Sequence, residues 1–123
     1  MITASLKNYR ISPRKFRVVA DLIRGKNAIL AGQILVHALK KAKTPLNDLL
    51  DSAIANAKHN FKIEPESLIV KEVRVDQGFV MKRHRPVSRG SAHPIKKRTS
   101  HVSITLAPVE VSKKAKTSKV KSK

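Results

Sequence analysis

The chain has 123 residues, a formal net charge of +19 and no cysteine. Its length predicts one domain, and the lack of cysteine excludes disulfides, thiolate zinc sites and cysteine nucleophiles. The net charge is +7 in residues 1–76 and +12 in residues 77–123, and such an excess favours a polyanionic partner. A membrane surface is disfavoured, because the basic residues concentrate outside the predicted helices. The start MITASLK has no apolar signal segment and no apolar run could span a membrane, so we expect a cytosolic protein.

The first predicted elements are a strand and a helix. Apolar and polar residues alternate over residues 2–10, which is the period of a strand with one buried face. Ser12 and Pro13 predict a helix start, with Ser12 as capping acceptor and proline in the first helical position. Gly25 is expected to end this helix in a left-handed conformation.

Two further helices are predicted. Asn27 is the candidate cap of the second, and lysines cluster at its expected C-terminal end, where the helix dipole favours positive charge: Lys40, Lys41 and Lys43. Thr44-Pro45 predicts the start of the third helix. Glu64-Pro65 predicts its end, because the residue before a proline is disfavoured in helical conformation.

Two strand-like runs follow. The first covers residues 68–75, but its apolar positions change parity, which predicts a β-bulge between Val70 and Val73. The second covers residues 100–106 and alternates regularly, with Val102, Ile104 and Leu106 facing the core.

A basic segment joins these two strands. It contains no carboxylate between Asp76 and Glu110, and its middle carries Pro86, Gly90 and Pro94. Fully extended, the stretch from Asp76 to Gly90 spans roughly 45 Å, which exceeds the diameter of a small domain. We therefore expect a β-hairpin arm over about 76–100 that protrudes from the domain.

The predicted fold class is α+β, with three helices packed on a small three-stranded antiparallel sheet and a long protruding β-hairpin arm. Residues 1–108 form a single domain that includes the arm. Residues 109–123 form a lysine-rich, flexible tail that is expected to be disordered.

No catalytic or metal-binding constellation is found. The five histidines lack the three or four converging ligands of a metal site, so we expect no enzyme activity, cofactor or metal. Few aromatic side chains are available to stack on bases, which favours recognition of the backbone and shape of folded RNA or a duplex. Two alternatives remain open: a DNA-bending protein with an apolar wedge at Pro86 and Val87, and a nuclease using His59 or His101.

Five segments carry a resemblance to a known family. The chain resembles the bacterial form of the universal large-subunit ribosomal protein numbered twenty-two, and the segments follow the family order: Arg10–Arg17, Leu22–Lys26, Ser52–Asn60, Val75–Gly78 and Lys96–Val102. They cover nearly all of the chain up to Leu106. At Val87 and Ser91 this chain lacks the arginines that the family commonly has near the arm tip.

The resemblance implies a structural protein of the large ribosomal subunit that binds ribosomal RNA and supports subunit assembly. Its hairpin would line the exit tunnel, with the tip near the nascent polypeptide. It would be a monomer contacting neighbouring ribosomal proteins, in a cytoplasmic ribosome, with an organellar ribosome left open. The positions that the resemblance assigns to RNA binding are Arg10, Ser12, Arg14, Lys15, Arg17, Arg24, Lys26, Asn56, Asn60, Lys82, Arg83, Arg85, Arg89, Lys96, Lys97, Arg98 and His101.

Overall fold

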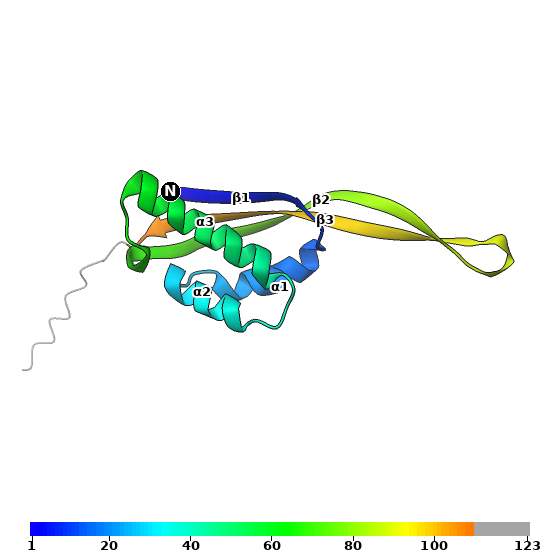
Figure 1. Cartoon of the computed structure of the whole chain (residues 1–123), viewed down its shortest axis with the longest axis horizontal. Coiled ribbons are helices and arrows are strands. Elements are labelled where there is room, and N and C mark those ends of the chain that lie inside the picture. The colour runs from blue at the N-terminus through cyan, green and yellow to red at the C-terminus, as the bar shows by residue number, and fades with distance from the viewer. Residues whose placement is uncertain (110–123) are drawn as a thin grey trace, which may run out of the picture.

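The computed structural model describes residues 1–109, so the predicted tail lies outside the described residues except for Val109. The elements are β1 (Ile2–Tyr9), α1 (Pro13–Ile23), α2 (Ala28–His37), α3 (Lys43–Phe61), β2 (Leu68–Pro86) and β3 (Ala92–Pro108), with 3-10 turns at Pro65–Ser67 and Ser88–Gly90 (Figure 1). No helix in the described part of the chain is both long enough and apolar enough to cross a membrane.

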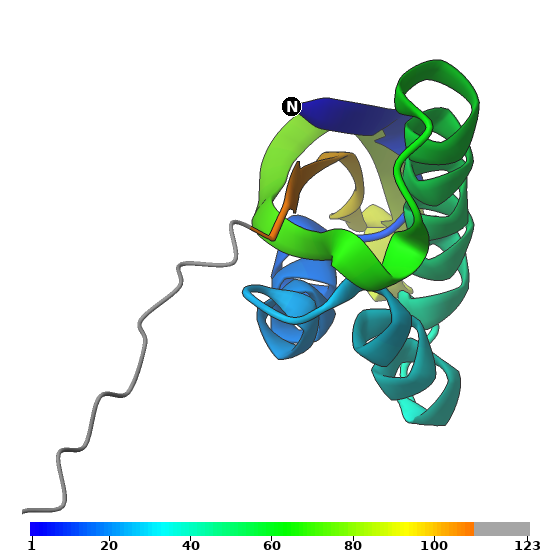
Figure 2. The same cartoon turned by 90° about the vertical axis from the view of Figure 1, so that its left-hand side faces the viewer.

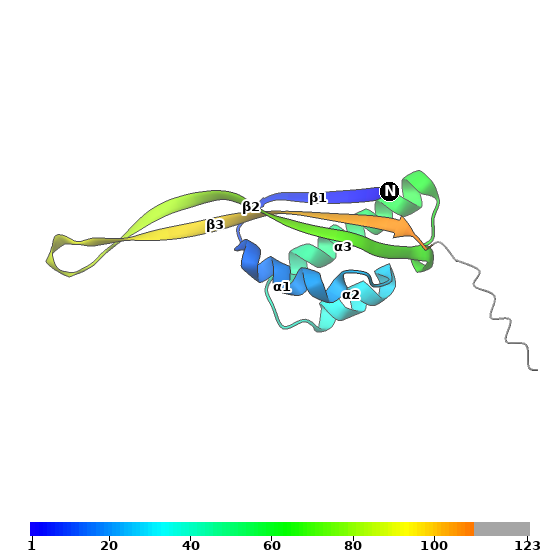
Figure 3. The ribbon, with the colours of Figure 1, turned by 180° about the vertical axis from the view of Figure 1, so that it is seen from behind.

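The sheet is antiparallel with the strand order β1-β3-β2. Viewed along the long axis, it is strongly curled, with α3 along one side and α1 and α2 below it (Figure 2). Beyond the helices only β2 and β3 continue, and they form the long arm (Figure 3). The predicted α+β class and the protruding hairpin are confirmed.

The core lies between the sheet and the helices and, apart from Phe16, is aliphatic. Val102, Ile104 and Leu106 of β3 are buried, as their alternation predicted. Phe16 of α1 is fully buried, and its ring meets Tyr9 edge to face at 5.8 Å between centroids.

The first helix begins and ends where predicted. Ser12 is the N-cap residue, but its side chain makes no capping hydrogen bond, so that detail of the prediction is wrong. Gly25 has a φ of 74°, and its N–H donates to the Val70 carbonyl at 2.9 Å. Asn27 caps α2 by accepting from the Ile29 N–H at 2.9 Å.

The boundary between α2 and α3 differs from the prediction. Because α2 ends at His37 and α3 already begins at Lys43, Lys40 and Lys41 lie in the linker and do not flank the end of α2. Of these three lysines only Lys43 contacts the C-terminal end of α2, where its Nζ donates to the Val36 carbonyl at 3.1 Å. The linker instead folds inward at Ala42, which is buried.

The C-terminal end of α3 also differs. The helix stops at Phe61, before Glu64-Pro65, and Lys62 ends it with a left-handed φ of 53°. The proline begins a separate 3-10 turn.

The predicted β-bulge in β2 is confirmed. Val70 pairs with Leu106 and Glu72 with Thr105, so Lys71 is the extra residue. Lys71 is exposed, and the bulge keeps the apolar side chains on both sides of it buried.

A second irregularity, which was not predicted, lies at the base of the arm. Gln77 pairs with Ser100 and Val80 with Arg98, so Gly78 and Phe79 oppose the single residue Thr99. The buried Thr99 hydroxyl donates to the Phe79 carbonyl at 2.6 Å. A side chain at position 78 would collide with the Thr99 hydroxyl oxygen, and its Cβ would also lie only 3.2 Å from the Thr99 carbonyl carbon.

The same region is fastened to the start of the chain. The Ser100 hydroxyl donates to the carbonyl of Ile11, and the N–H of Asn8 donates to Nδ1 of His101 at 3.0 Å. These bonds anchor the arm to the segment that leads into α1.

Candidate nucleic-acid interface

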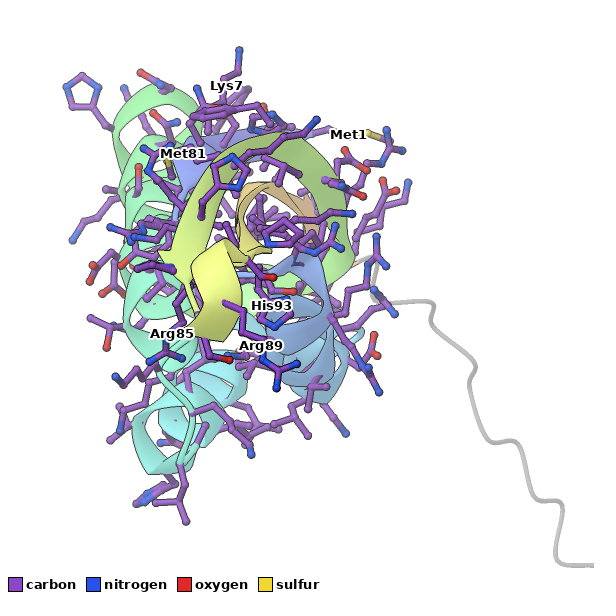
Figure 4. The ribbon with its side chains drawn as sticks, turned by 90° about the vertical axis from the view of Figure 1, so that its right-hand side faces the viewer. Met1, Lys7, Met81, Arg85, Arg89 and His93 are labelled. Carbon is purple, nitrogen blue, oxygen red and sulfur yellow. The ribbon has the colours of Figure 1, made fainter. Side chains whose placement is uncertain are left out.

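The arm is a β-ladder with a basic surface. Its pairing continues to Pro86 opposite Ala92, and none of the side chains from 82 to 98 is buried. Figure 4, viewed from the arm tip, shows Arg85, Arg89 and His93 pointing outward from the hairpin end.

Like charges face each other across this ladder. Lys82 lies directly opposite Lys96. Like charges in such positions destabilise a strand pair. A polyanion between or beside them removes that repulsion, so the arm is best suited to a negatively charged environment.

A concave surface lies where the arm meets the domain. We call it the basal groove; its volume is about 1010 Å³. Three segments line it, namely the start of α1, the α2–α3 linker and the return strand of the arm: Arg10, Ile11, Ser12, Arg14, Lys15, Val18, Leu39, Lys40, Lys41, Ala42, Lys96, Lys97 and Arg98. Eight of these residues are lysine or arginine, and no acidic side chain from residues 1–109 lines the groove.

The basal groove unites two groups of residues that the resemblance assigned to RNA. One group comes from the start of α1 and the other from β3. Sequence reasoning missed Lys40 and Lys41, because it placed them at a helix end. The density of lysine over residues 40–43 was the available signal.

Two assigned arginines have a structural role. Arg17 donates from Nη2 to the Val75 carbonyl at 3.2 Å, and Arg24 donates from Nη2 to the Val73 carbonyl at 3.1 Å. Both carbonyls lie on the outer edge of β2, which is an edge strand. The two side chains therefore hold α1 against that edge and satisfy its backbone.

Three further assigned residues also make internal hydrogen bonds. Asn56 donates to the Thr3 carbonyl at 3.5 Å, Asn60 donates to Asn56 Oδ1 at 3.2 Å, and His101 accepts from Asn8. They do not line the basal groove. Lys26 is exposed in the loop after α1.

The remaining assigned residues lie along the arm: Lys82, Arg83, Arg85 and Arg89. All four are exposed. Arg83 donates to the neighbouring Lys82 carbonyl at 2.8 Å, which leaves the rest of its guanidinium facing solvent.

Arg74 contrasts with the groove residues because it has an acidic neighbour. Its Nη2 lies 3.0 Å from Glu72 Oε1. This hydrogen bond, with the charges of Glu72 and Asp76, raises the pKa of Arg74. Among residues 1–109 no three His, Cys, Asp or Glu side chains gather as a metal site requires.

Comparison with known proteins agrees with this geometry. The family model for ribosomal protein L22p/L17e matches residues 4–107, which include both the basal groove and the arm. The chain belongs to this family. Curated relatives named large ribosomal subunit protein uL22 include those of Acholeplasma laidlawii (49% identical, covering 85% of this chain and 94% of the relative) and Rubrobacter xylanophilus (50% identical, covering 87% and 84%).

Membership in the L22p/L17e family makes the chain a structural ribosomal protein rather than an enzyme. It supports the ribosomal interpretation over the DNA-bending and nuclease alternatives. The relative from Desulfitobacterium hafniense, 50% identical over 97 residues, bears the same name.

Proposed function

We propose that this protein is a structural component of the large ribosomal subunit that binds ribosomal RNA through the basal groove and the arm. The main support for this proposal is that eight basic residues from three separate segments converge on one groove. No acidic side chain among the described residues lines that groove. A free protein would gain nothing from this concentration of like charge, whereas packed RNA phosphates compensate it.

The binding mechanism is neutralisation of phosphates combined with shape. Arginines such as Arg14 and Arg98 suit bidentate contact with a phosphate, and lysines such as Lys41 supply a point charge. RNA recognised in this way is folded, because its phosphates must approach the groove from several directions.

The arm would reach through the RNA and line the nascent-peptide exit tunnel, with its tip near the growing polypeptide. Its exposure on both faces and the like-charge pair Lys82–Lys96 support this proposal. The globular part would contact neighbouring ribosomal proteins as a monomer and support subunit assembly in the cytoplasm. Lys26, Asn56 and Asn60 are further proposed RNA contacts at the domain surface.

Sedimentation tests this function directly. Tagged protein should remain with the large subunit through a high-salt wash, because many phosphate contacts must break together. The free protein should prefer structured ribosomal RNA to duplex DNA of equal length. Release at moderate salt, or equal affinity for duplex DNA, would contradict the proposal.

A further inference from the structure

The basal groove has an aliphatic side as well as a basic one. Val18 and Leu39 both line it, and they are 55% and 97% exposed. Leu39 is the most exposed large apolar side chain in the described part of the chain. Phosphates can bind the cations of the groove, but they do not cover these apolar surfaces.

One unpaired nucleotide would satisfy both sides. In a paired stem the apolar faces of the bases are stacked inside the helix, and a protein meets only phosphates, sugars and polar base edges. An extruded nucleotide exposes the apolar face of its base while its flanking phosphates stay charged. A groove of about 1010 Å³ lies at the upper end of the range for sites that enclose a small molecule, which leaves room for a nucleotide and its neighbouring phosphates.

We propose that the basal groove is a socket for a single nucleotide extruded from folded RNA. The base lies against Val18 and Leu39, and the flanking phosphates meet Arg14, Lys41 and Lys97. This proposal rests on the proposed function, since it specifies the RNA feature that the same groove binds.

The socket should accept any of the four bases. Aliphatic side chains offer no donor or acceptor that would read a base edge, and an arginine guanidinium stacks on any base. An apolar segment of a neighbouring protein is the rival occupant. It would have to be acidic as well, because the walls carry Lys and Arg without acidic neighbours among the described residues.

Three synthetic RNA hairpins and three forms of the full chain test the proposal. The hairpins share one stem, which is fully paired, carries one extruded nucleotide, or carries an abasic residue at that bulge. The proteins are the wild type, Leu39→Ser and Val36→Ser. Val36 is the matched control, because it is a 63% exposed apolar residue that does not line the basal groove.

The wild type should bind the bulged hairpin roughly fivefold to tenfold more tightly than the paired or abasic one, as burial of a few apolar groups implies. Leu39→Ser should reduce this preference and Val36→Ser should keep it. Equal affinity for bulged and abasic RNA would overturn the socket while leaving RNA binding intact. Failure to bind any of the hairpins would overturn the proposed function as well. A photoreactive residue at position 39 that labels a protein in the purified subunit would assign the groove to the rival occupant.

Discussion

Arg24 donates through one guanidinium nitrogen to the Val73 carbonyl at 3.1 Å and through the other to Asp21 at 2.6 Å. It thereby connects the last residues of α1 to the edge of β2. A residue that the family resemblance assigns to RNA is thus also part of the domain's internal structure. Loss of RNA binding on its replacement would not by itself identify a phosphate contact.

Arg24→Ala should lower the free energy of unfolding by about 1 kcal/mol, because it removes a charge-assisted hydrogen bond that is partly exposed. Arg24→Lys should not restore this stability, since an ammonium group cannot serve both partners in the same planar geometry. Urea denaturation of the free protein measures the free energy of unfolding of both variants. Lys26→Ala is the control, and an equal effect there would mean that general charge, not the bond to Val73, is responsible.

Gly78→Ala should destabilise the protein by about 1–3 kcal/mol, because the added Cβ collides with the buried Thr99. Gly32→Ala should have the opposite sign and stabilise by about 0.5–1 kcal/mol. Gly32 lies within α2 with nothing within 4 Å of an added Cβ, and alanine is the better helix former. Thermal unfolding of the two variants distinguishes these effects. A neutral Gly78→Ala would disprove the tight contact at the base of the arm.

Replacing Lys40 and Lys41 with alanine should flatten the dependence of RNA affinity on salt. The log–log slope should fall by about one unit for each phosphate that the protein no longer neutralises. The matched variant replaces Lys58 and Lys71 with alanine. Both lysines are exposed and lie outside the basal groove, so this variant loses the same amount of positive charge. It should leave the slope nearly unchanged. Equal effects of the two pairs would indicate that net charge, and not the groove, sets the affinity.

Shortening the arm should separate its role from that of the groove. Residues 83–95 are removed and Lys82 is joined to Lys96 by an Asn-Gly turn, which suits the paired strands. This protein should fold and enter the subunit, because no core residue is removed and the groove stays whole. Deleting residues 82–98 should weaken RNA binding further, because it also removes one wall of the groove. Equal affinity of the two truncated proteins would show that the groove wall adds nothing.

Hydrogen exchange should distinguish the outer part of the hairpin, near its tip, from the inner part that belongs to the sheet. In the free protein, amides of residues 80–86 and 92–98 should exchange faster than those of residues 72–75 and 102–106. The outer ladder buries no side chain between 82 and 98 and contains the Lys82–Lys96 repulsion. Uniform protection along both strands would contradict this expectation.

Local patterns predicted most of the fold. The alternation at Val102, Ile104 and Leu106, the parity change after Val70 and the left-handed glycine at Gly25 are each visible within a few residues. The end of α2 could not be predicted in this way, because no helix-breaking residue follows His37 and the turn depends on burying Ala42 in the core. The second bulge was missed for a similar reason, since it depends on the contact between Gly78 and Thr99.

The candidate site was only partly predictable. Basic residues at the start of α1 and in the arm were identified, but their convergence with Lys40 and Lys41 depends on how distant segments pack. The structural role of Arg17 and Arg24 could not be inferred either, because nothing near them in sequence places the carbonyls of β2 beside α1.

Among the strands of residues 1–109, the central strand β3 is also the last to be synthesised. Ile2 pairs with Leu106, so β1 acquires its neighbour only when the chain has been made as far as Leu106. Until then the helices have no sheet to cover, and their apolar faces remain open to other nascent copies. Such late, long-range pairing is slow and prone to aggregation. The strong positive charge that suits the protein to its final partner would also keep these unfinished chains apart.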